Sequence, residues 1–365
     1  MSSNDYIKKL DSPGKADIVI AHWSVFGPGK SGLYETVKEL AAYEGRMDGV
    51  ISGIVEPDNP AGGNSDKSIE PNVVTQSHDW AFRDANVHMI HSSTASIQQR
   101  LDPTIFFLHG SPEAQIWSEL ETFDRGFSMS STFDYMDRSK VSIVFMKRHK
   151  WIWNRVAKGI DIRYVQKGID LERWNPKGMR MRFDGKPNIL YGEVWREIKD
   201  PFITFLAMDE YANKNPAMRF HPWALNDKRR MWERISDRGR FGRFLGQYQL
   251  SGTQLYPEHW YRGGDMLISP VLMGEPSRVL QESLASGCPT VTWDSDIFGD
   301  SISFKRARPF DPRDMAEKCH ELWEEIQSDP TGIRQKARRL AVENYSMSNM
   351  AEKVIDIVRE VLNRT

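Results

Sequence analysis

Short apolar runs alternate along the chain with stretches in which apolar residues recur at helical spacing. The first run, residues 16–23, is rich in β-branched residues and predicts a buried strand. A glycine-rich loop at 26–32 separates it from residues 33–44, which predict a helix, and a second strand is expected at 49–55. This succession of strand, loop, helix and strand is typical of the beginning of a doubly wound parallel sheet.

The alternation of strands and helices continues through the rest of the chain. Turn signals between about 168 and 186 divide it into two α/β halves. Because ligands of such sheets bind at the carboxyl ends of the strands, we expect the site in the cleft between the two halves. The remaining strands are expected at 87–92, 104–110, 141–146, 186–194, 243–248, 265–270 and 289–295, and helices at about 311–328, 331–343 and 348–365.

The composition agrees with two soluble globular domains. The chain has 365 residues, which is long for one core, and it is 39% hydrophobic and 27% charged with a net charge of −1. No apolar run is long enough to span a membrane, and residues 1–15 lack the apolar centre of a secretory signal. Two cysteines, Cys288 and Cys319, cannot build a disulfide framework or a zinc cluster, so we expect a cytoplasmic protein.

The charge is unevenly distributed. Residues 138–186 contain 14 Lys and Arg against 4 Asp and Glu, and the stretch 146–155 combines cations with two tryptophans. Such a mixture suits a phosphate-rich partner. The alternative is a solvated helix face with a buried aromatic stripe, which is the commoner origin of a charge run.

A glycine pattern at the first loop points to phosphate binding. Gly27, Gly29 and Gly32 match G-x-G-x-x-G between a strand and a helix, as in a dinucleotide-binding oxidoreductase. Small residues at this place let a phosphate or sugar approach backbone N–H groups at a helix N-terminus. A P-loop is excluded, because Ser24 stands where that pattern needs glycine.

Further candidates lie where strands end. His22, His91 and His109 each close an apolar strand, and His109 is the best candidate because Gly110 permits close approach of the backbone. A lone histidine is nevertheless more often structural. The acidic loop 294–296 could hold a divalent metal, but no other ligand cluster supports that interpretation.

The stretch 274–291, GEPSRVLQESLASGCPTV, contains two glutamates at the start of a predicted helix. Glu275 is expected at the mouth of the helix and Glu282 on the helix itself. The loop N–H groups and the helix dipole favour an anion or sugar hydroxyls there. Taken alone, a glutamate on a helix faces solvent in most cases. Gly287 and Pro289 end the helix.

In this context, 274–291 resembles the donor-site segment of GT-B glycosyltransferases, notably glycosyltransferase family 4. Residues 107–113, 165–176, 189–201 and 344–358 are similar to further segments of that family, in the same order. Two departures stand out. The spacer between the two glutamates is one residue shorter, and Glu193 stands where the family usually has arginine, with Arg196 as the nearest substitute.

The resemblance implies an α/β fold with two Rossmann-like domains facing a cleft. The acceptor-side domain is expected at 1–167, the nucleotide-sugar domain at 168–345, and a helix at 346–365 that returns to the first domain. The implied reaction is a retaining, metal-independent transfer of a hexosyl or pentosyl group to a hydroxyl. The donor is a UDP- or GDP-sugar, and no further cofactor is required.

The resemblance also implies roles for individual residues. Arg196 and Lys199 stabilise the leaving diphosphate, and His109 lies beside the donor sugar. Glu275 holds a sugar hydroxyl, and Glu282 accepts hydrogen bonds from the ribose. The donor-binding set is completed by Gly29, Pro276, Ser277, Arg278 and Val279.

The sequence leaves the donor sugar, its base, the acceptor and the oligomeric state open. The basic segment 138–186 favours a polyanionic acceptor such as DNA with hydroxylated bases, with cations on phosphates and aromatic rings against an extruded base. A phospholipid head group or a cell-envelope saccharide is the alternative. Two other function classes remain, a dinucleotide-dependent oxidoreductase and a nucleotide-sugar binder without catalysis.

Overall fold

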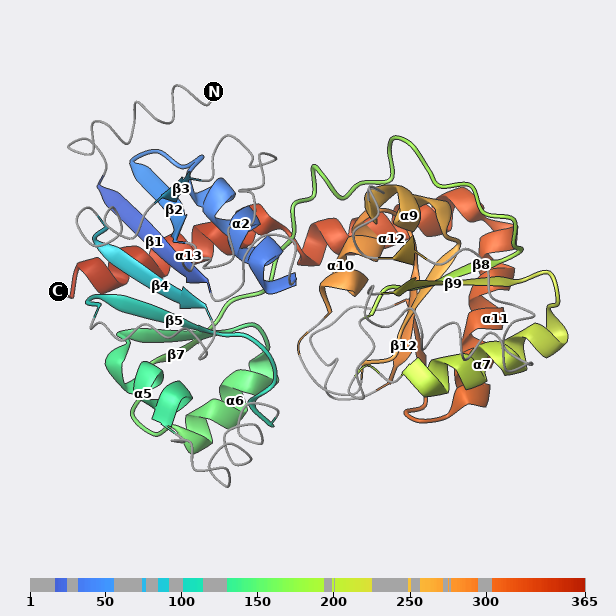
Figure 1. Ribbon diagram of the computed structural model, residues 1–365, viewed down its shortest axis with the longest axis horizontal. Coiled ribbons are helices and arrows are strands. Elements are labelled where there is room, and N and C mark those ends of the chain that lie inside the picture. The colour runs from blue at the N-terminus through green and yellow to red at the C-terminus, as the bar shows by residue number, and fades with distance from the viewer. Residues whose placement is uncertain are drawn as a thin grey trace. The chain divides into compact units, whose positions relative to one another are not determined.

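The chain forms two compact units, one of which is made of two separate segments. Unit 1 comprises Met1–Gly168 and Ser346–Thr365, and unit 2 comprises Ile169–Tyr345. The expected strand at 243–248 and the glycine loop up to residue 31 lie outside the described residues. The computed structural model (Figure 1) describes residues 17–24, 32–55, 74–76, 85–91, 101–113, 130–193, 199, 201–224, 249–250, 257–271, 275, 277–294 and 304–364.

Unit 1 is built on a seven-stranded parallel sheet with the order β3-β2-β1-β4-β5-β6-β7. The order reverses beside β1, which is the mark of a doubly wound sheet. Its strands are β1 (Ile18–Ser24), β2 (Val50–Val55), β3 (Val74–Gln76), β4 (Val87–His91), β5 (Thr104–Leu108), β6 (Val141–Val144) and β7 (Ile162–Tyr164). Its described helices are α2 (Gly32–Glu44), α5 (Ser130–Arg138), α6 (Lys147–Val156) and α13 (Met347–Leu362).

The two faces of this sheet follow the period of two along each strand. Ile18 and Ile20 point to the face covered by α13, whereas Val19 and Ala21 point to the face covered by α5 and α6 (Figure 1). Helix α13 begins after Ser346, whose Oγ accepts a hydrogen bond from the Asn349 amide. Its buried residues recur at helical spacing and complete the core of unit 1: Met347, Met350, Ala351, Val354, Ile355, Val358 and Val361.

Unit 2 contains a six-stranded parallel sheet with the order β10-β9-β8-β11-β12-β13. Helices α7 and α11 cover one face, and α9, α10 and α12 pack on the other. The strands are β8 (Asn188–Tyr191), β9 (Arg219–Ala224), β10 (Gln249–Leu250), β11 (Met266–Ser269), β12 (Thr290–Trp293) and β13 (Lys305–Ala307). The helices are α7 (Pro201–Lys214), α9 (Pro257–Gly263), α10 (Arg278–Ala285), α11 (Pro312–Ser328) and α12 (Pro330–Asn344).

The expected fold class, α/β with two doubly wound parallel sheets, is confirmed. Strand β5 ends two residues earlier than expected, so that His109 and Gly110 follow it, and Gly110 has a φ of 98° that favours glycine. Strands β3, β7, β9, β10 and β13 were not predicted. Among the described residues, no helix is both long enough and apolar enough to cross a membrane.

Candidate functional site

The carboxyl end of β8 carries an ion pair inside unit 2. Glu193, which follows this strand after Gly192, is 3% exposed. Its Oε1 accepts a hydrogen bond of 2.7 Å from the Ser269 hydroxyl, and its Oε2 lies 3.1 Å from Nζ of Lys199. Ser269 is the last residue of β11, the parallel neighbour of β8, so the pair lies where two strands end together. Lys199, a predicted diphosphate contact, is therefore held by a carboxylate.

Glu282 is buried on α10 and has a donor on each oxygen. Nε of Arg278 lies 2.6 Å from Oε1, and the Tyr261 hydroxyl donates to Oε2 at 3.0 Å. Arg278 precedes Glu282 by one helical turn, and its guanidinium lies 6.0 Å from the centre of the Trp174 ring. The carboxylate is thus held in one orientation by two side chains.

Tyr261 is influenced by the carboxylates of both Glu282 and Glu193. Burial raises the pKa of Tyr261 well above its usual range, and the nearby carboxylates of Glu282 and Glu193 raise it further, while Arg278 lowers it. The phenol therefore stays protonated and acts as a donor. Of these three charged groups, Glu282 accepts the hydrogen bond of the Tyr261 hydroxyl.

A close contact joins the end of β8 to the start of α10. A Cβ on Gly192 would lie 2.7 Å from Cγ1 of Val279 and 3.4 Å from the Tyr261 hydroxyl oxygen. Ser277 caps α10, since its Oγ accepts a hydrogen bond from the Val279 amide at 3.2 Å. Glycine at 192 lets the strand end approach the N-terminus of the helix, where backbone N–H groups favour anions.

Both glutamates of the 274–291 stretch are buried rather than surface charges. Glu275 is 9% exposed and Glu282 is 8% exposed. Unit 2 therefore brings together Lys199, Ser277, Arg278, Val279 and Glu282 on neighbouring elements. Three predicted site residues, Arg196, Gly29 and Pro276, lie outside the described part of the chain.

His109, the predicted neighbour of the donor sugar, belongs to unit 1. It follows β5, and its Nε2 lies 3.1 Å from Nδ1 of His91. The ring lies 4.9 Å from that of Phe145, measured between centres. Since Nε2 of His91 lies 2.9 Å from Nδ1 of His22, His109 is the end of a row of three histidines rather than an isolated side chain.

Residues that could hold a metal do not cluster in the described part of the chain. Asp294, the described member of the acidic loop 294–296, lies 3.5 Å from Nη1 of Arg306. This contact gives Asp294 a structural partner.

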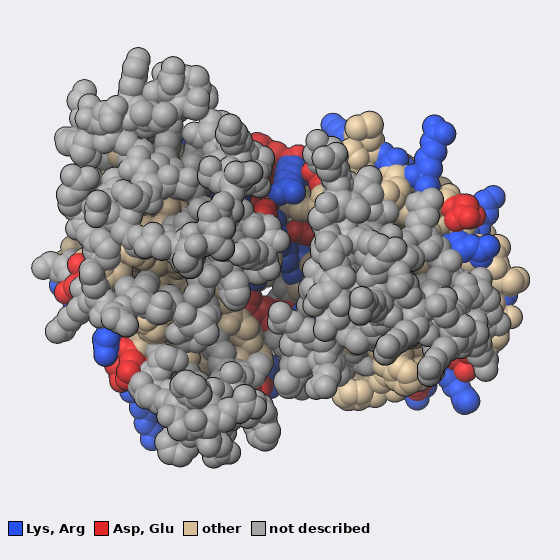
Figure 2. All heavy atoms as spheres, viewed as in Figure 1, with Lys and Arg blue, Asp and Glu red and all other residues tan. Residues whose placement is uncertain are grey.

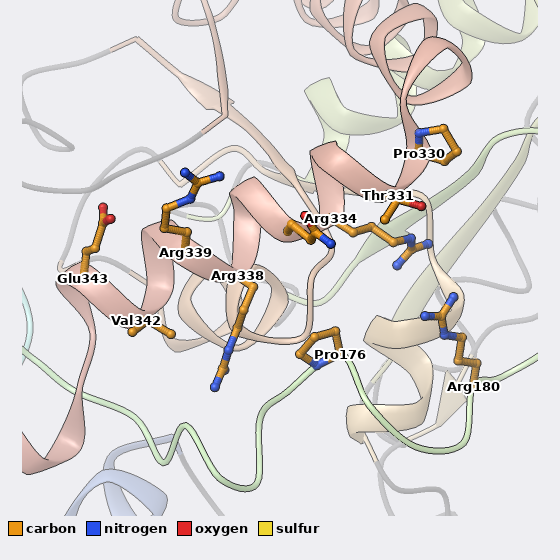
Figure 3. A pocket seen from close by; sticks show the side chains of 10 residues that line it. Pro176, Arg180, Pro330, Thr331, Arg334, Arg338, Arg339, Val342 and Glu343 are labelled. Carbon is orange, nitrogen blue, oxygen red and sulfur yellow. The ribbon is translucent and has the colours of Figure 1, made fainter.

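A groove of about 540 Å³ runs along α12 on unit 2 (Figure 3). Two of the arginines that line it donate to backbone carbonyls. Arg338 reaches the carbonyls of Ala285 at 3.1 Å and Leu171 at 2.9 Å, and Arg334 reaches that of Gly264 at 2.8 Å. Since Ala285 ends α10, Arg338 binds a carbonyl left open at a helix C-terminus. These two arginines thus fasten α12 to its neighbours.

The basic segment 138–186 is partly neutralised within the fold. Arg148 pairs with Glu113, Lys140 lies 3.3 Å from Asp102, and Nε of Arg163 lies 2.6 Å from Asp161. Where described atoms are visible in Figure 2, basic and acidic side chains are interspersed.

The two tryptophans of this segment differ. Trp153 is buried in the core, as expected for an aromatic stripe, whereas Trp151 is 56% exposed and carries the Arg155 guanidinium 3.8 Å from its ring centre.

Sequence reasoning missed two members of the unit 2 cluster, the name that we give to Glu193, Lys199, Tyr261, Ser269, Arg278 and Glu282. Tyr261 follows Trp260 in a short helix and resembles an ordinary core residue, and Ser269 ends a strand without any distinguishing neighbour. Glu193 was noticed only as a departure from a family pattern. Its position directly after a strand and a glycine was the available signal.

Known structures resemble the whole chain. The sucrose-phosphate synthase of Thermosynechococcus elongatus matches with a TM-score of 0.70 and 13% identity over 95% of this chain and 100% of that chain. OtsA matches with a TM-score of 0.66 and 13% identity over 93% and 98% of the two chains. HepE of Anabaena, solved with UDP and glucose, matches with a TM-score of 0.68 and 11% identity over 94% and 100%.

These matches extend over both units and agree with the two parallel sheets. This is the GT-B fold. No protein-family model and no curated protein sequence matches the chain. The GT-B fold expected from the sequence is thereby confirmed, and the narrower likeness to glycosyltransferase family 4 stays a prediction.

Proposed function

We propose that this GT-B protein is a glycosyltransferase that moves a sugar from a nucleoside diphosphate sugar to a hydroxyl group. The observation that carries the proposal is the buried Glu282 carboxylate, held by Arg278 and Tyr261 on the helix that follows β11. Such a fixed acceptor suits the hydroxyls of a ribose. It lies on the first turns of α10, whose N-terminus favours a diphosphate.

The nature of the similar structures supports a UDP-sugar donor. HepE was solved with UDP and glucose, and a trehalose-6-phosphate protein of E. coli with UDP-2-fluoro glucose. The latter matches with a TM-score of 0.65 and 13% identity. We assign the donor to unit 2, with Glu275 at a sugar hydroxyl and with Pro276, Ser277 and Val279 around the phosphates and the nucleoside.

The chemistry requires stabilisation of the leaving diphosphate. The bond between the anomeric carbon and the phosphate oxygen breaks, and the electron pair stays on that oxygen. Lys199 and Arg196 stabilise the charge that develops there, because preorganised cations need no reorganisation during the reaction. In a retaining transfer the acceptor hydroxyl attacks on the same face and its proton passes to the leaving phosphate oxygen. The charge is carried by side chains, so this scheme uses no metal.

Glu193 changes how much positive charge Lys199 can offer to the diphosphate. Its carboxylate lies 3.1 Å from Nζ of Lys199 and orients the ammonium, but it also offsets the positive charge. We infer that Arg196 supplies much of the net positive charge, while Lys199 supplies a directed N–H donor.

The donor assignment is tested by thermal shift with a panel of UDP- and GDP-sugars, followed by hydrolysis of the sugar that stabilises most. Lys199→Ala should lower kcat by about 10²–10³-fold, as loss of one transition-state donor does elsewhere. Lys177→Ala, at an exposed lysine of the same unit, is the matched control and should leave kcat unchanged. If no nucleotide sugar stabilises the protein, the proposal fails. Stabilisation by a nicotinamide dinucleotide alone would favour the oxidoreductase alternative.

For the acceptor we propose a polyanion, and nucleic acid with hydroxylated bases in particular. The supporting feature is α6, where exposed Trp151 is stacked with Arg155 and could face an extruded base. Binding to single-stranded and duplex DNA should weaken steeply between 50 and 200 mM salt. Trp151→Ala should weaken it further. Absence of DNA binding at low salt would leave a phospholipid head group or a cell-envelope saccharide as the acceptor.

A further inference from the structure

The groove along α12 brings four arginines together on unit 2. Arg334, Arg338 and Arg339 come from the helix, and Arg180 comes from the segment that precedes β8 (Figure 3). Of the residues that line the groove, Glu343 alone is acidic. Four guanidinium groups against one carboxylate leave the lining with three net positive charges. The groove therefore attracts anions.

The four arginines are of two kinds. The guanidinium groups of Arg334 and Arg338 donate to backbone carbonyls, and their role in fastening α12 explains their presence. Arg180 and Arg339 are exposed, and neither forms a hydrogen bond or an ion pair with another residue in the described part of the chain. Fastening thus explains two of the cations, and the other two are available to a ligand.

Cations are crowded at one end of the groove. Figure 3 shows the guanidinium groups of Arg180 and Arg334 pointing toward one another near Thr331. Nη1 of Arg334 lies 3.4 Å from the carbonyl oxygen of Arg262. Burial lowers the pKa of Arg262, Glu258 raises it, and the nearby charge of Arg180 lowers it further. An anion bound at this end would offset the repulsion between these cations.

The groove has the size and the lining of a small-molecule site. Its volume of about 540 Å³ lies within the range of about 300–1,000 Å³ that is typical of ligand pockets. Thr331, Gln335 and Arg339 recur every four residues of α12 and form an exposed polar row. This row is about 12 Å long at 1.5 Å per residue. Three further side chains supply apolar contact area: Pro176, Pro330 and Val342.

Carboxylates at both ends of α12 limit the length of the ligand. Asp329 caps the helix, and its Oδ1 accepts a hydrogen bond of 2.8 Å from the Gly332 amide. Glu343 is the last residue but one of the helix, and Asp265 lies 3.8 Å from Nη2 of Arg334. A nucleic acid carries its phosphates in a continuous line and would bring some of them against these carboxylates. The charge pattern therefore favours a short ligand over a polymer.

We propose that this groove binds a phosphorylated small molecule whose phosphate lies between Arg180 and Arg334. Guanidinium groups suit this role because their planar arrangement of N–H donors can bind two phosphate oxygens at once. The remainder of the molecule extends along α12, where Gln335 and Arg339 offer an amide and a guanidinium to its hydroxyl groups.

The groove and the proposed donor site lie at opposite ends of α10. Arg338 donates to the carbonyl of Ala285, the last residue of this helix, at 3.1 Å. The donor is assigned to the other end, where Ser277 caps the helix. A ligand in the groove therefore leaves the donor site open, and it does not compete with UDP.

Calorimetric titration of the full-length protein with ribose 5-phosphate and with inorganic phosphate tests the site. At about 150 mM salt, charges farther apart than about 8 Å are largely screened, so that a general attraction of anions is suppressed. We expect one saturable site that binds ribose 5-phosphate more tightly than phosphate, because the groove also contacts the sugar. An excess of UDP should leave the Kd unchanged. Absence of saturable binding, or displacement of ribose 5-phosphate by UDP, would overturn the proposal.

Two single variants locate the bound molecule. Arg180→Gln should weaken binding of ribose 5-phosphate by about 10–100-fold, as loss of a charged hydrogen bond does, and Arg339→Gln by about 2–10-fold. Arg182→Gln is the matched control, because Arg182 is an exposed arginine of the same segment that does not line the groove. It should leave the Kd unchanged. The thermal unfolding midpoint should stay the same in all three variants, since these side chains are exposed.

An equal loss of affinity in Arg182→Gln would show that net charge alone attracts the phosphate, and this result would refute the site. Binding of single-stranded DNA that depends on Arg180 and Arg339, without binding of ribose 5-phosphate, would refute the small-molecule ligand. These measurements need no sugar transfer, so the groove and the proposed transferase activity succeed or fail separately.

Discussion

Replacing Glu282 by glutamine is the sharpest test of the unit 2 cluster. The substitution preserves the shape of the side chain and removes its charge. Glu282 now accepts from Nε of Arg278 at 2.6 Å and from the Tyr261 hydroxyl at 3.0 Å. Glutamine has one carbonyl oxygen, so it can keep one of these bonds and must turn its NH₂ group toward the other donor.

The expected loss follows from the burial of the pair. A lost hydrogen bond to a charged group costs about 1.5–3 kcal/mol. Removing one partner of a fully buried ion pair costs about 3–5 kcal/mol. The side chains of Arg278 and Glu282 are 9% and 11% exposed, so some water reaches the charge left behind. We therefore expect Glu282→Gln to lower the free energy of unfolding of unit 2 by about 3 kcal/mol.

A double-mutant cycle isolates the contribution of the pair. Arg278→Met removes the cation, and Glu282→Gln should then cost less, with a coupling energy of about 2 kcal/mol. Urea unfolding followed by tryptophan fluorescence reports on this unit, because Trp174 and Trp260 lie in the same core as α10. Glu343→Gln, at an exposed glutamate of α12, is the matched control and should change stability by less than about 0.5 kcal/mol.

Affinity for UDP, measured by calorimetry, should fall in Glu282→Gln if this carboxylate accepts from the ribose. If the losses of unfolding free energy in Arg278→Met and Glu282→Gln are additive, the contact between the two side chains does not hold Glu282 in place. A Glu282→Gln variant as stable as the wild type would show the same. Loss of stability with unchanged UDP affinity would instead refute its role in donor binding.

Three further outcomes are expected. Gly192→Ala brings a Cβ to 2.7 Å from Cγ1 of Val279, so it should lower the free energy of unfolding by about 1–3 kcal/mol and weaken UDP binding. Urea unfolding and calorimetry measure the two effects, and an unaltered UDP affinity would contradict the expected effect on the donor site. Gly168→Ala places a Cβ 2.6 Å from the Ser346 carbonyl oxygen and should lower the urea midpoint of unit 1 while leaving that of unit 2 unchanged. Burial lowers the pKa of His88 to about 4, so below pH 6.5 this side chain is protonated in the unfolded chain but stays neutral in the folded chain. The free energy of unfolding should therefore fall by up to about 3 kcal/mol between pH 6.5 and 4, and by less in His88→Phe.

Much of the fold could be predicted because most strands are continuous apolar runs bounded by turns. Strands β1, β2, β4 and β6 were expected within two residues of their ends. Strand β9 was missed because it reads RFHPWA, and Pro222 inside a run argues against a strand that has neighbours on both sides. Strand β13 reads KRA, and its cations suit an edge strand but carry no apolar signal.

The candidate site could be predicted only in part. The 274–291 stretch indicated Glu275 and Glu282, but a single glutamate on a helix does not reveal whether it is buried. The pairing of Glu193 with Lys199 and of Tyr261 with Glu282 depends on which strands are neighbours and on how a helix packs against them. The contacts of His22 with His91 and of His91 with His109 have the same origin. The three histidines were noticed at strand ends, whereas their alignment depends on strand order and register.

Helix α13 gives the chain an order of assembly during synthesis. It covers the face of the first sheet formed by residues such as Ile20, Met89 and Phe107, yet the ribosome makes it only after the whole of unit 2. Until then this apolar face lacks the cover that α13 supplies, while residues 169–345 are already complete. Unit 2 can therefore fold first, and the nascent sheet of unit 1 is the part of the chain that a chaperone would have to shield from aggregation.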